Sequence, residues 1–124
     1  DSNNADLSME IINLVDDGGL NPESEDPGDD VISDAIEVLI WVDMNDDPGT
    51  PGDNVFQDGI ETVLHDGTIF SLEAAGKLIV INNAAAFNTY YIGFSWELPS
   101  GVGNEAQGDF CTFDIVFGAD QIVP

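Results

Sequence analysis

The feature that most constrains the fold is a two-residue alternation of side-chain character within Tyr90–Gln121. In its first half, every second residue is apolar and falls on one face: Tyr90, Ile92, Phe94, Trp96 and Leu98. After the connection Pro99–Asp109, a second set keeps the same spacing: Cys111, Phe113, Ile115 and Phe117. A period of two places one face of a β-strand in a core and leaves the other face wetter, and a helix does not produce it. The segment therefore predicts two strands and a β protein.

The remaining pattern predicts an all-β fold along the whole chain. Further runs with strand character are Leu7–Val15, Ile36–Val42, Thr62–Leu64 and Thr68–Phe70 around a turn at Asp66–Gly67, and Lys77–Asn82. About seven strands separated by Gly, Pro and Asp clusters predict an antiparallel β-sandwich or jelly-roll-like single domain spanning residues 1–124.

Three local details accompany this fold prediction. The alternation shifts near Ile12–Asn13, which indicates a bulge. Ile36–Val42 is apolar on both faces, so we expect this strand to be covered on both sides. Ser71–Ala75 is predicted as one helical turn, with Ser71 as the N-cap and Gly76 as its stop.

The charge excludes several classes of partner. The chain holds 25 Asp and Glu residues against the single base Lys77, for a net charge of -24. Nucleic acid and anionic membranes are excluded as electrostatic partners because both require a basic surface. Self-repulsion also opposes self-association, but in molar salt the Debye length falls to about 3 Å. The composition therefore indicates a halophilic environment, bound divalent cations, or both.

Residues 43–61 form an acidic connection that is a candidate calcium loop. Asp43, Asn45 and Asp47 have the alternate oxygen spacing of calcium loops, and Asp53, Asp58 and Glu61 add the oxygens needed for six to eight ligands. An EF-hand is excluded because Pro48 stands where that loop needs Gly and Asn54 stands where it needs Glu. The alternative is a solvated acidic turn. We expect calcium as cofactor, because clustered carboxylates repel one another unless a cation holds them.

No residue pattern predicts catalysis. His65 is the only histidine and lies beside Asp66, but no nucleophile is positioned by the sequence. A carboxylate pair of the glycosidase kind is uninformative among so many acids. Cys111 is the only cysteine, so it forms no internal disulfide, and its apolar neighbours predict a buried structural thiol. No apolar run is long enough to cross a bilayer, so we expect no membrane insertion.

A set of stretches also carries a family resemblance. These are Tyr90–Pro99, Val102–Gln107 and Phe113–Gln121, with Ile40–Asp43, Asp53–Glu61 and Asp66–Ile69 upstream. The set resembles archaeal secreted proteins with SipW-type signal peptides, which are relatives of the TasA and camelysin fibre proteins. The resemblance covers most of the chain from about Leu7.

The resemblance implies a jelly-roll-like domain exported to the cell surface. Its better-known relatives, including archaeal bundling pili, polymerise by lending a strand to the next subunit. Family members usually carry a signal peptide and further strands before the region that matches Leu7, and many carry additional cysteines. A domain without those strands has an unfilled edge that invites pairing. We therefore predict residues 1–15, Asp1–Val15, as a donor or interface strand.

Together these observations predict a secreted structural subunit, not an enzyme. The predicted partner is a second copy of the chain, in a head-to-tail homopolymer assembled by strand exchange. The alternative is a monomeric secreted calcium-dependent adhesin or carbohydrate-binding module. A secreted hydrolase is the remaining rival.

Overall fold

The computed structural model describes residues 4–17, 32–44, 51–99 and 110–122. Within these ranges the chain forms strands, one short 3-10 helix (η2) and one α-helix. In chain order they are β1 (Ala5–Asp17), η2 (Ile32–Asp34), β2 (Glu37–Val42), β3 (Val63–Thr68), α1 (Ile69–Ala75), β4 (Leu78–Ala84), β5 (Ile92–Glu97) and β6 (Phe110–Gln121). The all-β prediction is confirmed.

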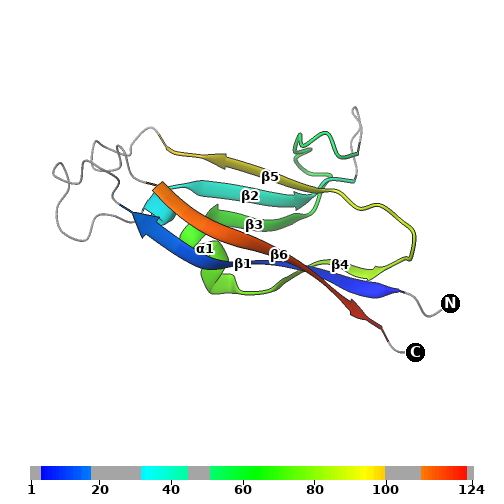
Figure 1. Cartoon of the computed structure of the whole chain (residues 1–124). Helices are drawn as coiled ribbons and strands as arrows, with labels where there is room; N and C mark the ends of the chain where they lie inside the picture. Colours follow the sequence, from blue (N-terminus) through cyan, green and yellow to red (C-terminus); the bar gives the residue numbers. More distant parts are fainter. Residues whose placement is uncertain (1–3, 18–31, 45–50, 100–109, 123–124) are drawn as a thin grey trace.

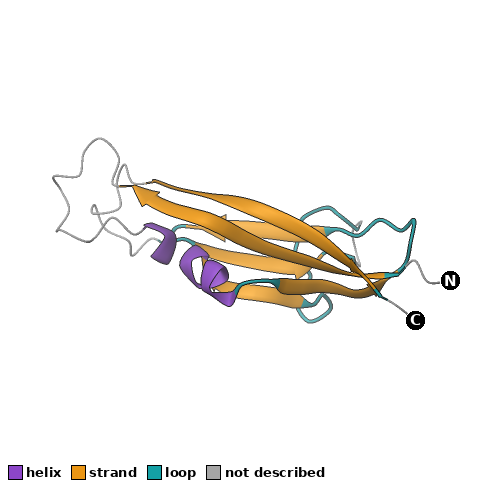
Figure 2. Cartoon of the chain, turned by 60° about the horizontal axis from the view of Figure 1, so that its bottom comes forward, coloured by secondary structure: helices purple, strands orange, loops and turns teal. Residues whose placement is uncertain are grey.

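Two antiparallel sheets make up an elongated sandwich. The first sheet has the order β4-β1-β6 and the second has the order β3-β2-β5. The strands run mostly along the length of the molecule, and both helices lie towards one end of it (Figures 1 and 2). The first and last described strands meet at the other end, where the Ile122 amide donates to the Asn4 carbonyl at 3.0 Å. The two alternating segments that dominate the sequence, β5 and β6, therefore lie in different sheets.

The core lies between the sheets and is built from alternate residues of the central strands β1 and β2, together with residues of α1 and β4. Its buried members are Met9, Ile11, Val38, Ile40, Ile69, Leu72 and Val80. Strands β1 and β2 are central in their sheets, so their inward side chains are covered from both sides of each strand. Burial of such aliphatic side chains stabilises a fold by about 1.5–3 kcal/mol each.

Helix α1 covers part of one long side of the sandwich, towards one end (Figure 2). It follows β3, an edge strand of one sheet, and leads into β4, an edge strand of the other. The Ile69 amide donates to the Ile36 carbonyl at 3.1 Å, and Glu73 Oε2 accepts from the Leu14 amide at 3.3 Å. The helix thus connects both sheets on the β3/β4 side.

The α1 region corrects two sequence predictions. Thr62–Leu64 and Thr68–Phe70 were expected as strands flanking a turn at Asp66–Gly67, but β3 runs unbroken through that dipeptide, and Ile69 and Phe70 begin α1. The reason is tertiary, because both turn-type residues pair with β2. The N-cap is Thr68, not Ser71: Thr68 Oγ1 accepts from the Ser71 amide at 3.1 Å.

Two other details are confirmed. Gly76 caps the helix with φ 71°. The β1–β6 register shifts between Ile12 and Val15, and Asn13 has φ 56°, as expected of a bulge.

Candidate functional site

The structure describes four of the six predicted calcium ligands. Asp43 and Glu61 are buried, with 1% and 7% exposure, whereas Asp53 and Asp58 are exposed. The remaining two, Asn45 and Asp47, lie outside the described residues.

Asp43 is held tightly at the end of β2. Its amide donates to the Tyr91 carbonyl at 2.8 Å, and its carbonyl accepts from the Gly52 amide at 3.0 Å. Its Oδ2 accepts from the Asn54 amide at 2.7 Å. In the described part of the chain, Oδ1 is buried and has no hydrogen-bond partner. A buried carboxylate normally needs more compensation than one amide provides.

Two other described acids of the loop have local partners. Asp53 Oδ1 accepts from the Val55 amide at 2.9 Å, and Glu61 Oε1 accepts from the Gln57 amide at 2.7 Å. Both contacts shape turns. Within the described ranges, no three His, Cys, Asp or Glu side chains gather into a group that would hold a metal. The calcium site therefore stays a prediction, and Asp43 is its best-supported ligand.

The segment of residues 51–62 covers the outer face of the β3-β2-β5 sheet around Trp41, near the end of β2. Trp41 points to that face, is 1% exposed and packs edge-to-face on Phe56 with ring centroids 5.5 Å apart. Gly93 on the neighbouring strand leaves room for the indole, since a Cβ there would overlap it. Coverage of β2 on both faces is thereby confirmed at Trp41, whereas Leu39 on the same outer face is half-buried and Glu37 is exposed.

Asn54 also occupies the edge of β5. With φ 61°, its side chain turns onto Phe94: Oδ1 accepts from the Phe94 amide at 2.9 Å, and Nδ2 donates to its carbonyl at 3.3 Å. These main-chain groups are the ones that an additional strand would use. The β5 edge is therefore blocked at this position.

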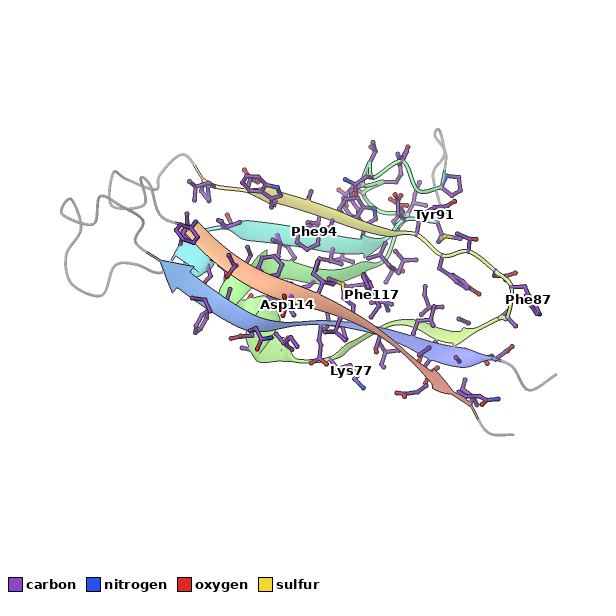
Figure 3. All side chains as sticks on the ribbon, viewed as in Figure 1. Lys77, Phe87, Tyr91, Phe94, Asp114 and Phe117 are labelled. Atoms are coloured by element: carbon purple, nitrogen blue, oxygen red, sulfur yellow. The ribbon has the colours of Figure 1, made fainter. Side chains whose placement is uncertain are left out.

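The opposite side of the sandwich, between β5 and β6, is open. Residues paired across an antiparallel ladder point to the same face. Trp96 pairs with the core residue Val38, and Phe117 pairs with the core residue Met9, so both point inward. Both are nevertheless 66% exposed, and inward-pointing Ile115 is 45% exposed. Among the described residues, nothing corresponding to α1 covers this side (Figure 3).

Two apolar hollows open along β6. One, of about 190 Å³, is lined by Ile36, Ile69, Phe94, Trp96, Cys111 and Phe113. The other, of about 150 Å³, is lined by Leu7, Ser8, Val80, Ile81, Tyr90, Ile92, Phe117 and Gly118. We call these the Trp96 hollow and the Phe117 hollow. The structure thus has an incompletely filled interior along one edge, and alternation alone did not indicate which side it would be.

Cys111 corrects a further prediction. It was expected to be buried, but it lines the Trp96 hollow and is only partly buried. The reason is that β6 is an edge strand, so its inward face is covered from one side only. Burial, and after it the Asp16 carboxylate, raise the pKa of the Cys111 thiol above its ordinary value.

One polar pair was not found by sequence reasoning. His65 Nε2 lies 3.0 Å from Ser71 Oγ. Ser71 Oγ donates its only proton to the Thr68 carbonyl at 2.7 Å, so His65 must donate to Ser71 through a protonated Nε2. That tautomer is the reverse of what a general base needs. The pair reinforces the start of α1, and the assignment of Ser71 as N-cap obscured it.

No helix among the described residues combines the length and the apolar character that a membrane crossing requires. Comparison of the chain with models of known protein families, with curated proteins and with solved structures gives no match. The fibre-protein resemblance drawn from the sequence stays a prediction.

Proposed function

We propose that the protein is a structural subunit of an extracellular, cell-surface filament, in which each subunit is completed by a strand from a neighbouring copy. The single observation that carries the proposal is the open side between β5 and β6. Inward-pointing Ile115, Phe117 and Trp96 are exposed there although their ladder partners belong to the core. Exposed apolar residues on a strand edge are a site for pairing with another chain.

The free edge of β6 is the proposed acceptor. Strand β6 spans Phe110–Gln121 and, within the described residues, pairs on one side only, with β1. The corresponding edge of β5 has its Phe94 groups bonded to Asn54. A strand added to β6 gains main-chain hydrogen bonds, and its alternate side chains cover Ile115 and Phe117.

The donor was predicted as Asp1–Val15, and its place in the fold limits how it can act. Most of it belongs to β1, which pairs with β4 on one side and β6 on the other. Exchange of β1 between neighbouring subunits would fill the place between β4 and β6 and leave the free edge of β6 uncovered. The strand added at that edge is therefore a segment other than β1. Without exchange, the end of the sandwich near Asn4 and Ile122 remains available as an interface.

Charge sets the conditions for assembly. Copies with a net charge of -24 repel one another, and screening within about 3 Å in molar salt removes most of this penalty. The proposal therefore places the filament in a salt-rich exterior, with calcium at Asp43 as a second means of reducing repulsion.

The test is sedimentation velocity with negative-stain microscopy in molar sodium chloride, with calcium or a chelator. We expect fibres from the native chain, and none from Phe117→Asp. The control Ile60→Asp adds the same charge at a residue that is 52% exposed in the loop 51–62, and it should still polymerise. A native chain that stays monomeric at high concentration in molar salt refutes the proposal and favours the monomeric adhesin.

A further inference from the structure

Phe87 is an unusual residue at the tip of the connection between β4 and β5. Its relative exposure is 102%, so no neighbour covers the ring. Its backbone φ is 64°, in the left-handed region where bulky side chains are genuine outliers. A strained backbone that displays a fully solvated aromatic ring is unfavourable in the isolated subunit. Such an outlier is a reason to look for a function.

The tip is held in this shape by Tyr90. Its hydroxyl accepts from the Ala85 amide at 2.9 Å and from Asn88 Nδ2 at 3.5 Å. These bonds link residues on both sides of Phe87 to the Tyr90 hydroxyl. The ring projects beyond the strands at one end of the molecule (Figure 3). A tip whose backbone is fixed in this way loses less entropy on binding than a free loop.

The surroundings of Phe87 suit an acidic partner. Leu78–Trp96 is the longest stretch of the chain without Asp, Glu, Lys or Arg. In a molecule with net charge -24, it is the segment that another equally acidic surface approaches with least repulsion. A basic partner would favour the acidic faces instead. The charge distribution therefore indicates a second copy of this chain as the partner of this tip.

The Trp96 hollow offers a matching receptor on that second copy. None of its lining residues is charged, and its volume is about 190 Å³. An apolar cavity of roughly 150 Å³ holds a benzene ring. The hollow lies where β2 and β6 begin and β5 ends, which is the end opposite to Phe87 (Figures 1 and 3). The ring of a given molecule therefore faces away from its own hollow.

We propose that Phe87 of one subunit inserts into the Trp96 hollow of the next. This inference rests on the proposed homopolymer. It adds which two surfaces meet between successive subunits along the filament. Phe87 and the Trp96 hollow lie on different surfaces of the subunit. The contact between two copies is therefore heterologous and repeats head to tail. The added strand on β6 covers Ile115 and Phe117, further along the same side.

The first test compares Phe87→Ala with Phe70→Ala in molar salt. Phe70 is 50% exposed on α1 and does not line the hollow. We expect Phe87→Ala to raise the concentration needed for assembly by about tenfold or more, as central aromatic contacts do, and Phe70→Ala to leave it near native. If the native chain assembles and Phe87→Ala assembles equally well, only this inference fails. If the native chain does not assemble, the proposed function fails.

The second test uses the native thiol in the hollow. Ala86→Cys keeps the Phe87 ring and both bonds to the Tyr90 hydroxyl, and it places a new thiol beside Phe87, where the proposal brings it close to Cys111 of the next subunit. Oxidation should give a ladder of covalent multimers on a non-reducing gel, which the added Cys111→Ser removes and the added Phe87→Ala weakens. The reaction is run at mildly alkaline pH because the Cys111 pKa is raised. Dimers alone, or a ladder insensitive to Cys111→Ser, overturn the inference.

Discussion

The two tryptophans of the β3-β2-β5 sheet differ strongly in solvent exposure. Trp41 on β2 points to the outer face and is 1% exposed, whereas Trp96 on β5 points inward and is 66% exposed. The outer residue is buried because Phe56 and the space at Gly93 accommodate it. The inner residue is exposed because, in the described parts of the chain, its side of the sandwich lacks a cover. Strand alternation sets where a side chain points, and the coverage of each face sets whether it is buried.

The largest expected effect comes from truncating the two tryptophans. Trp41→Ala should lower the free energy of unfolding by about 3–5 kcal/mol, because it empties a filled site. Trp96→Ala should lower that of the monomer by less than about 1 kcal/mol, since most of the ring is already solvated. Urea unfolding of both variants in dilute protein measures the difference. Equal losses would show that the comparison is wrong.

Gly93→Ala tests how tightly Trp41 is packed on the outer face of the β3-β2-β5 sheet. The new Cβ would overlap the Trp41 ring, so we expect a loss of about 3 kcal/mol from overpacking. Gly118→Ala on β6 is the matched control, because its Cβ would meet only the Ser8 hydroxyl, at 2.8 Å. Its cost should be clearly smaller. A tolerated Gly93→Ala would mean that Trp41 is not packed as tightly as described.

Substitution of Asp43 tests whether its buried carboxylate binds calcium. Calcium at about a hundred times its dissociation constant should stabilise the native chain by about 2.7 kcal/mol. Asp43→Asn should lose this gain and be no less stable than the native chain in chelator, because a buried charge is removed. Thermal unfolding with and without calcium measures both, with exposed Asp34→Asn as control. A calcium response unchanged in Asp43→Asn argues against Asp43 as a ligand.

The smallest effect concerns the edge of β5. Asn54→Gly keeps the positive φ but removes both bonds to Phe94, so we expect a loss of about 1 kcal/mol and faster hydrogen exchange at the Phe94 amide. Asn83→Gly is the control, because Asn83 also has positive φ but its Oδ1 bonds to the Asn4 side chain. Unchanged exchange at Phe94 would show that Asn54 does not protect this edge.

The sequence predicted features that depend on local pattern. The β1 bulge and the helix stop at Gly76 were predictable because short-range conformational preferences decide them. The continuity of β3 through Asp66–Gly67 was not, because pairing with β2 overrides the turn preference of that dipeptide. In the candidate site, Asp43 was identified from oxygen spacing, but nothing local indicated that one of its oxygens would be buried without a partner.

What the sequence alone determined is the acidic charge and the alternation of side chains along β1, β2, β5 and β6, since each depends on residues next to one another in the chain. Only the tertiary structure decided which sides are closed. Trp41 is covered by Phe56, the β5 edge is blocked by Asn54, and β5 and β6 face each other from different sheets. These contacts join segments distant in sequence. Their existence depends on how the sheets pack, which no period in the sequence encodes.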